Sequence, residues 1–418
     1  MKTFATQRAG GVNRPNSQIA QDFLDLTFQM ESGRPLPWLT RFEGPIKVSV
    51  QGQAPASLEG DLARLLSRLR AEAGINISRA KSGEAAQIVV EAIPRKTLQK
   101  AVPQAACFVV PNVSGWSEFK RNRGNGTTDW TRLSNRTKAT VIIPNDVSPQ
   151  EVRDCLHEEI SQALGPLNDL YRLPDSIFND DNFHTILTGF DMLILRAYYS
   201  PQLRNGMTRG QTARVLPGLL SSLNPRGNRA TNTGANRTPK QWNDAITSAL
   251  ALRTPKSQRA SKAAQAVKIA QSQGWKDNRL AFSLFVQGRV SLASHPESAI
   301  SAFVQSGNIY KKLYGASVHS AHVNTQMAAF ALSSGQLDVA IRLTDEGIPA
   351  ARNSSNAALL ATLLMIKAES LEAAGRVDEA RRVRLDSLGW GRYGFGSERN
   401  VRARLNEIKA LAPRRVRS

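Results

Sequence analysis

The sequence predicts an α+β domain in the N-terminal half of the chain and an all-α domain in the C-terminal half. Its 418 residues correspond to two or three domains at about 150 residues per domain. The first half alternates strand-like segments with amphipathic helices, whereas the last part repeats a pattern of small residues at helical spacing. Hydrophobic residues make up 41% of the chain, which is enough for ordinary buried cores.

The charge is distributed unevenly along the chain. Lysine and arginine number 55 against 34 aspartates and glutamates, which gives a net charge of +21. Residues 151–200 reverse this balance, with nine acidic and three basic side chains. The longest apolar run, 357–366, is about half of the roughly 20 residues that span a bilayer, so no membrane span is expected. The acidic stretch is therefore the first place to look for chemistry.

The α+β part is predicted element by element. Residues 47–52 alternate and end at a glycine, which predicts a strand. Residues 58–73 carry one leucine stripe, which predicts an amphipathic helix. Four more strands are predicted over 75–78, 86–92, 106–110 and 139–143, with a long exposed loop over 111–137. Ser148 and Pro149 supply helix-start signals, so a second helix is predicted from there to Gly165.

This second helix carries the chemically interesting pattern. Glu158 and Gln162 are four residues apart and therefore share one helical face. Gly165 ends the helix at a position that tolerates a left-handed turn, and Asn168 follows three residues later. Glu159 lies next to Glu158, but adjacent helical side chains project about 100° apart, so the two are not expected to form an acid/base pair.

This spacing resembles the metzincin zinc peptidases, whose frame is HExxHxxGxxH. The resemblance implies that Glu159 stands in the place of the general base, and that Glu158, Gln162 and Asn168 occupy the positions of the three zinc-binding histidines. All three histidines are absent. The glycine and the glutamate of the frame remain.

The resemblance extends beyond this helix and covers roughly residues 40–200. Residues 176–180, Ser-Ile-Phe-Asn-Asp, are similar to the metzincin Ser-Ile-Met turn, with Phe178 in place of methionine and Asp180 where some members place a tyrosine ligand. Residues 187–198 are similar to the closing helix of that family. The same run is similar to an uncharacterised bacterial domain of unknown function. The resemblance implies a metzincin-like α+β fold, with a mixed sheet and an active-site-type helix.

The resemblance leaves the metal question open, and we expect no cofactor. Zinc favours imidazole and thiolate, and amide oxygens are poor substitutes. The alternative is a weakly bound hard divalent cation held by the oxygens of Glu158, Gln162 and Asn168, with Asp169, Asp180 or His184 as contributors. A further alternative is an active hydrolase with these unusual ligands. The other acidic residues of the stretch, including Asp180, are expected to cap turns, and Asp191 to form a capping box with Thr188.

The C-terminal part contains an internal repeat with a period of about 40 residues. Ala368, Gly375 and Ala380 match Ala328, Gly335 and Ala340, and a weaker copy contains Gly288, His295 and Ala299 or Ala302. Small residues at these offsets allow two antiparallel helices to pack closely, which resembles a tetratricopeptide-type repeat. The predicted boundaries are a metzincin-like domain over 15–208, a basic linker over 209–239 and a helical-repeat domain over 240–412.

The function predicted from these features is non-catalytic binding or scaffolding. A pseudo-metallopeptidase cleft and the helical-repeat surface would engage a protein or peptide partner. One alternative is a metal-dependent peptidase with Glu159 as general base. Another is a nucleic-acid-associated regulator that uses the basic residues between Arg204 and Arg259 and the tail 414–417, although no nucleic-acid-binding motif accompanies them.

The two cysteines, Cys107 and Cys155, leave the compartment open. In an exported protein they would form one disulfide, and in a cytosolic protein they would be two buried thiols. The first 15 residues lack the apolar core of a secretory signal. We therefore expect an exported or periplasmic protein if a leader has been removed and the disulfide forms, and a cytoplasmic protein otherwise.

Overall fold

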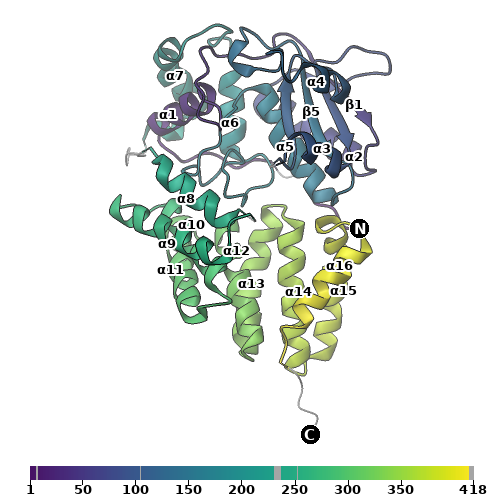
Figure 1. Cartoon of the computed structure of the whole chain (residues 1–418), viewed down its shortest axis with the longest axis vertical. Helices are drawn as coiled ribbons and strands as arrows, with labels where there is room; N and C mark the ends of the chain where they lie inside the picture. The colour runs from purple at the N-terminus through teal and green to yellow at the C-terminus, as the bar shows by residue number, and fades with distance from the viewer. Residues whose placement is uncertain (6–7, 104, 230–236, 252, 414–418) are drawn as a thin grey trace. The chain divides into compact units, whose positions relative to one another are not determined.

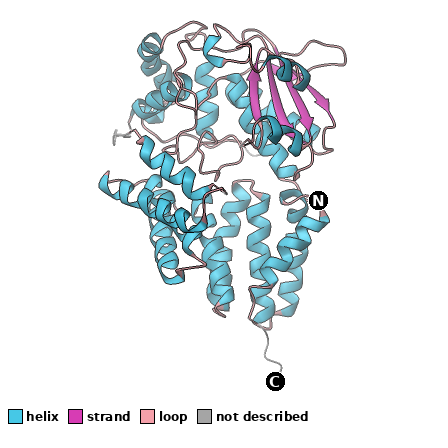
Figure 2. Ribbon diagram, in the orientation of Figure 1, coloured by secondary structure: helices cyan, strands magenta, loops and turns pink. Residues whose placement is uncertain are grey.

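A computed structural model describes residues 1–5, 8–103, 105–229, 237–251 and 253–413. Contacts within the chain define two compact units. The first, residues 5–235, is called the α/β unit, and the second, residues 1–4 with 236–418, is called the helical unit (Figure 1). The predicted combination of an N-terminal domain with a mixed sheet and an all-helical C-terminal region is confirmed (Figure 2).

The sheet of the α/β unit has five strands in the order β2-β1-β3-β5-β4. Their bounds are β1 (Ile46–Gly52), β2 (Ile77–Arg79), β3 (Ile88–Ile93), β4 (Phe108–Pro111) and β5 (Ala139–Pro144). All neighbouring strands are parallel except β4, which runs antiparallel to β5 and pairs Val109 with Val141. The five predicted strands are all present, with shifts of one or two residues at their ends.

Alternate residues of β5 enter two different cores. On β5, Val141 faces the main core together with leucines of α2 (Leu58–Ala73) and α5 (Pro149–Leu164). Ile142 faces the other side and packs with α3 (Arg95–Ala101) and α4 (Trp116–Asn122). Successive side chains of a strand point to opposite faces of the sheet, so apolar residues on both faces of β5 are covered by helices.

Several short elements were not predicted. The expected loop over 111–137 contains α4 and the 3-10 helix η1 (Trp130–Arg132), because Trp116, Phe119 and Trp130 bury their rings there. The helix α1 (Asn16–Thr27), which packs against α7 (Arg209–Leu223), was also not predicted, although Ile19, Phe23 and Leu26 lie at helical spacing and are buried. Tertiary burial of a few aromatic side chains, rather than local periodicity, specifies α4 and η1.

The start of α5 forms as predicted. Ser148 caps it by accepting a hydrogen bond from the backbone N–H of Glu151, and Pro149 occupies the first turn, where no N–H partner is needed. Its C-terminal end is held by Arg136, whose buried guanidinium donates to the carbonyl oxygens of Gln162, Ala163 and Gly165. A cation at this end also complements the helix dipole.

The predicted left-handed turn at Gly165 is wrong. Its φ of −169° is extended backbone. A glycine is needed there for another reason: a Cβ atom would lie 3.0 Å from the Tyr198 ring, which belongs to α6 (Gly189–Tyr198). The chain therefore turns back after α5 through close packing against an aromatic ring.

Cys107 and Cys155 form a disulfide whose Cα atoms are 6.0 Å apart. The bond joins the residue that precedes β4 to the middle of α5. The structure thus bears out the pairing, and the compartment stays a prediction.

The helical unit consists of consecutive helices joined by short turns. Their bounds are α8 (Lys240–Leu250), α9 (Lys256–Ser272), α10 (Asn278–Ser291), α11 (Pro296–Tyr314), α12 (Val318–Ser333), α13 (Leu337–Asn353), α14 (Ala357–Ala373), α15 (Val377–Gly394) and α16 (Glu398–Lys409). Each helix from α8 to α15 contacts the next along the chain.

The two clear copies of the repeat are the pairs α12–α13 and α14–α15. Gly335 and Gly375 stand in their turns with φ of 72° and 80°, the left-handed region that favours glycine. In both turns the residue after the glycine donates a backbone hydrogen bond to a carbonyl five residues earlier. The matching alanines of each pair are buried between the helices. The repeat found in the sequence is therefore one of helix pairs with equivalent turns.

The segment predicted as a basic linker over 209–239 is helical over much of its length. Thr208 and Gln211 form a capping box that starts α7, and η2 (Pro225–Asn228) follows it. The later part, 230–236, and the basic tail, 414–418, lie outside the described residues. None of the described helices combines the length and apolarity that a bilayer crossing requires.

The packing of Gly165 against Tyr198 yields a test of the fold. We expect Gly165→Ala to lower the free energy of unfolding by about 1–3 kcal/mol, because the added methyl group overpacks the ring. The matched control is Gly218→Ala in α7, where a Cβ meets no atom within 4 Å. That change should raise stability by about 0.5–1 kcal/mol through helix propensity. Urea unfolding of both variants measures the difference, and equal effects would contradict the packing argument.

Candidate functional site

The chain that follows α5 is tied by its backbone to the end of α1. The N–H of Leu167 donates to the carbonyl of Leu26, and the N–H of Glu31 donates to the carbonyl of Leu167. The side-chain amide of Asn168 donates to the carbonyl of Asp25 at 2.9 Å, and its oxygen accepts from the N–H of Asp169. Asn168, one of the three metzincin ligand positions, thus uses both ends of its amide on the backbone.

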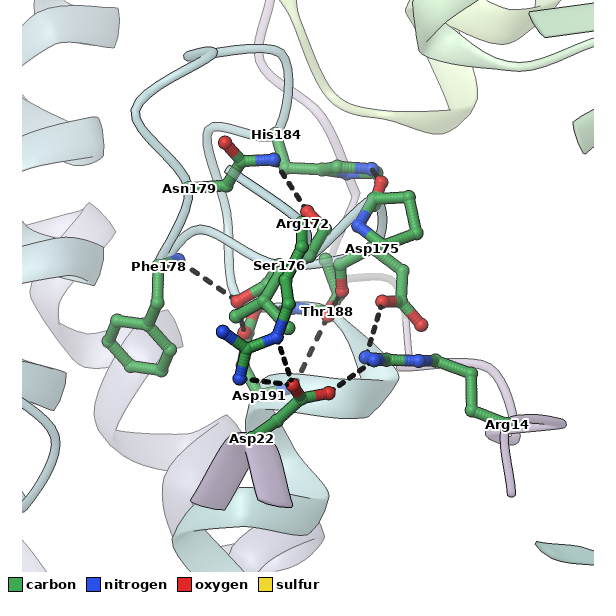
Figure 3. Close-up of polar contacts among 12 residues, drawn as sticks. Arg14, Asp22, Arg172, Asp175, Ser176, Phe178, Asn179, His184, Thr188 and Asp191 are labelled. Atoms are coloured by element: carbon green, nitrogen blue, oxygen red, sulfur yellow. Dashed lines mark hydrogen bonds and ion pairs between the residues drawn. The ribbon is translucent and has the colours of Figure 1, made fainter. Parts of the chain in front are cut away.

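A buried ion-pair network fixes the same segment to α1. Arg172 donates to Asp22 at 2.8 Å and to Asp25 at 2.9 Å. Arg14 pairs with both Asp22 and Asp175 (Figure 3). Arg209, at the start of α7, pairs with Asp25. Here buried carboxylates are matched by guanidinium groups, which is the usual requirement for burying charge.

The turn that resembles the metzincin Ser-Ile-Met turn is held by Asp191 at the start of α6. Asp191 accepts hydrogen bonds from the Ser176 hydroxyl at 2.5 Å and from the N–H of Ile177 (Figure 3). It also forms the predicted capping box with Thr188, which is confirmed. Phe178 follows in this turn with its ring fully buried. The turn is therefore rigid and anchored to a helix.

Each of the two histidines of the α/β unit forms a hydrogen bond with the backbone through one ring nitrogen. His157 Nδ1 accepts from the N–H of Leu187 at 3.1 Å, and burial, reinforced by Arg153, holds its pKa well below the usual value. His184 Nε2 donates to the carbonyl of Pro174, and burial lowers its pKa also. The negative charge of Asp175 acts in the opposite direction and raises the pKa of His184. His184, a predicted contributor to a cation site, thus serves the turn.

Four acidic side chains of α5 and of the two segments that follow it have raised pKa values and are linked by charge repulsion. They are called the carboxylate cluster and comprise Glu158, Glu159, Asp169 and Asp180. Glu158 and Glu159 offer carboxylate oxygens within 4.8 Å of each other, although they are adjacent on the helix, which corrects the expectation that they point apart. Asp169 and Asp180 flank a closed loop whose ends are joined by the hydrogen bond from the N–H of Leu170 to the carbonyl of Phe178.

Burial and mutual repulsion raise the pKa values of all four carboxyl groups. Burial is the largest cause throughout. It raises the pKa of Glu158 to about 7, aided by Asp180 and Glu31, and that of Asp180 to about 6. It raises the pKa of Glu159 and of Asp169 well above the usual range, with Glu158 as the charge that contributes most. Among these, Glu159 is only 4% exposed.

No basic side chain compensates this charge. Across the described residues, no lysine or arginine forms an ion pair with any member of the carboxylate cluster. One oxygen each of Glu159 and Asp169 is buried without a hydrogen-bond partner. By contrast, the nearby Asp22 and Asp25 both pair with Arg172. The cluster lacks such a partner although the chain carries a net charge of +21.

The donor set of the cluster consists of oxygen atoms. The Cys107 sulfur lies within 4.8 Å of the carboxylate oxygens of Glu158 and Glu159, but it belongs to the disulfide and is not a thiolate. Gln162 is half-buried, and its backbone carbonyl accepts from Arg136. Oxygen donors suit hard cations such as Ca²⁺ or Mg²⁺ better than zinc.

The structure therefore brings together only part of the predicted site. Glu158, Glu159, Asp169 and Asp180 interact through their charges, whereas Asn168 and His184 bond to the backbone. Asp180 and Asp181 were both expected to cap the turn, and Asp181 does so by accepting from Asn179 and from the N–H of Phe183. The exposed Glu31 at the edge of the cluster was missed, because no local pattern connects it to residues more than 120 positions later.

Comparison with known proteins gives one relationship. Residues 16–218 match the family described as a protein of unknown function (DUF2927). No curated protein and no solved structure matches the chain. The matched region spans α1 to α7 and includes the whole carboxylate cluster.

The raised pKa values predict a pH-dependent stability difference. A carboxyl group whose pKa is raised by folding stabilises the folded state below its unfolded pKa and loses that contribution as pH rises through its folded pKa. For Glu158 and Asp180 this window runs from about pH 4 to pH 7. In chelator-treated protein, the double variant Glu158→Gln, Asp180→Asn should therefore gain Tm relative to wild type as pH rises from 5 to 8.

The control for this measurement is Glu151→Gln, which makes the same substitution in the first turn of α5. Its Tm difference from wild type should not grow over the same pH range. The comparison between variants removes the opposing titration of the buried histidines, which is common to all of them. A constant difference for the double variant would show that the cluster does not repel itself as described.

Proposed function

We propose that the protein is a non-catalytic binding protein whose helical unit engages an extended segment of a protein or peptide partner. The α/β unit would keep the frame of a metzincin-like peptidase without acting as a zinc peptidase. The helix pairs of the helical unit resemble tetratricopeptide-type repeats, which present surfaces for extended segments. One observation carries the proposal: the helical unit already accommodates an extended segment of its own chain.

That segment is residues 1–4, which lie against α15. The N–H of Lys2 donates to the carbonyl of Gly389 at 3.0 Å, and the Lys2 ammonium pairs with Asp386. The Phe4 ring stacks on Trp390 with ring centroids 4.4 Å apart. A main-chain hydrogen bond, an ion pair and an aromatic stack are the contact types by which proteins recognise short extended segments.

The sequence of α15 permits this approach because its last turns are rich in glycine. A Cβ atom at Gly389 would lie 3.1 Å from the Lys2 side chain. Two further glycines of the helix, Gly391 and Gly394, accommodate Val401 of α16 and the backbone of α14 at Ala358. Gly391 and Gly394 therefore allow the helices of the unit to pack closely, whereas Gly389 allows residues 1–4 to approach α15.

The proposal is favoured over a zinc peptidase by the state of Glu159. A general base must be ionised near neutral pH and must reach a metal-bound water. Burial raises the pKa of Glu159 well above its usual range, which disfavours the ionised form that a general base needs. Among the described residues, the group of possible metal ligands around Glu159 contains no histidine.

Binding of a labelled peptide tests the proposal. The probe is a synthetic peptide with the sequence of residues 1–5, Met-Lys-Thr-Phe-Ala, and the receptor is the full chain with Phe4→Ala, whose own segment is weakened. We expect this variant to bind the peptide at least about fivefold more tightly than wild type, because a tethered segment competes at an effective concentration near millimolar. Fluorescence anisotropy gives both dissociation constants.

The receptor variants set the control. Adding Gly389→Leu to the Phe4→Ala chain should abolish binding, because the new side chain fills the space that Lys2 occupies. Leu385→Ala, at a 67% exposed position of the same helix, should leave binding unchanged. Equal binding by wild type, by the Phe4→Ala chain and by the chain that also carries Gly389→Leu would contradict the proposal.

The enzymatic alternative has its own test. Purified protein is expected to contain zinc well below one equivalent by elemental analysis, and to leave mixed peptide substrates uncleaved. Stoichiometric zinc, together with cleavage that is lost in Glu159→Gln, would establish the peptidase instead. Glu151→Gln is the matched control, because it alters a glutamate of α5 outside the carboxylate cluster.

A further inference from the structure

We propose that the α/β unit binds a small organic anion, with a phosphate or carboxylate head group on an apolar body, in an arginine-lined cavity between α2, α6, η2 and the segment 8–12. This inference goes beyond the proposed function, which concerns the helical unit, because it assigns a ligand to the α/β unit. The cavity has a volume of about 760 Å³, which lies within the roughly 300–1,000 Å³ of small-molecule sites. A small organic molecule therefore fits within this one unit.

The first observation is the charge of the cavity. Among the described residues that line it, Glu72 provides the only carboxylate, whereas four arginines provide positive charge: Arg8, Arg68, Arg196 and Arg226. These arginines come from parts of the chain that lie far apart in the sequence, namely the segment before α1, then α2, α6 and η2. The fold thus gathers an excess of positive charge around one cavity.

The single carboxylate of the lining is already matched within the unit. Arg68, whose side chain is buried, donates to the two carboxylate oxygens of Glu72 at 2.8 and 3.0 Å. The N–H of Ala9 donates to the second of these oxygens at 3.0 Å. Glu72 is therefore neutralised by one arginine, and the other three arginines give the cavity its net positive charge.

These three arginines form no ion pair with a carboxylate within the described parts of the chain. Arg196 donates through Nε and Nη2 to the backbone carbonyl of Glu72. Arg226 is exposed, and its Nη1 lies 3.2 Å from the position that a Cβ would take at Gly11. Guanidinium groups match the oxygens of phosphate and carboxylate groups in charge and geometry. An anion in the cavity would supply the negative charge that the chain does not.

The second observation is the apolar part of the lining. Ala71 of α2, Leu223 of α7 and Pro225 of η2 line the cavity and keep apolar surface exposed or half-exposed there. An inorganic anion would leave this surface in contact with water, whereas an organic body covers it and gains the hydrophobic effect. The lining therefore selects an anion that carries an apolar group.

The walls of the cavity are fixed by contacts within the unit. The hydrogen bond from Ala9 to Glu72 holds the segment 8–12 against α2. The same segment packs closely against the start of α6, because a Cβ at Gly189 would lie only 2.0 Å from the carbonyl oxygen of Gly10. A glycine at this position is what permits the approach. A cavity with preorganised walls loses little conformational entropy when a ligand binds.

Isothermal titration calorimetry of the full chain at pH 7 tests the proposal. The probes are 1-naphthyl phosphate and 1-naphthoate, which carry the two head groups on the same apolar body. We expect at least one of them to bind at a single saturable site per chain, and the tighter of the two identifies the head group. Inorganic phosphate and neutral 1-naphthol should each bind at least about tenfold more weakly, because each lacks one of the two recognised parts. Absence of binding by both anions overturns the proposal, and so does binding of 1-naphthol or inorganic phosphate as tight as that of the better anion.

Four variants at exposed positions, where the fold tolerates substitution, locate the site. Arg226→Gln removes a guanidinium of the lining and should weaken binding of the better anion at least about fivefold. Arg214→Gln makes the same change on α7 outside the lining and should bind as wild type does. Ala71→Leu narrows the cavity and should also weaken binding, whereas Ala63→Leu on the same helix, outside the lining, should not. Equal binding by Arg226→Gln and Arg214→Gln, or by Ala71→Leu and Ala63→Leu, would place the anion elsewhere and overturn the proposal.

Discussion

The repulsion among four buried or half-buried carboxyl groups is the constraint around which the α/β unit is organised. Burial raises the pKa of Glu158, Glu159, Asp169 and Asp180. Arginines neutralise the neighbouring Asp22 and Asp25, and hydrogen bonds satisfy Asp191. Among the described residues the cluster has no basic partner, so its ionisation lowers the stability of the fold as pH rises.

The scaffold does this by making the chain turn back sharply after α5. Arg136 caps the carbonyl end of the helix, and the packing of Gly165 against Tyr198 sets the direction in which the chain leaves. Asn168 then fastens the chain to α1, and the charge of Glu158 acts on the next residue, Asp169. In the metzincin frame the corresponding segment delivers a third histidine. In this chain the same spacing delivers an aspartate one residue later.

The sequence predicted those parts that local chemistry specifies. The strands, the Ser148 cap and the Thr188–Asp191 capping box follow from alternation and capping rules. The short helices α3 and α4 were missed because their formation depends on tertiary burial, whereas α1 has the apolar spacing of a helix and was predictable. In the site, Glu158 and Asp169 could be named from spacing, but Glu31 and the commitment of Asn168 to Asp25 could not, since both depend on where distant segments meet.

The central claim concerns the ionisation of the carboxylate cluster, and a ¹³C NMR titration of the side-chain carboxyl carbons of Glu158 and Asp180 in the full chain measures it most directly. The account predicts a pKa of about 7 for Glu158 and of about 6 for Asp180. Ordinary pKa values of about 4 for both groups would contradict it.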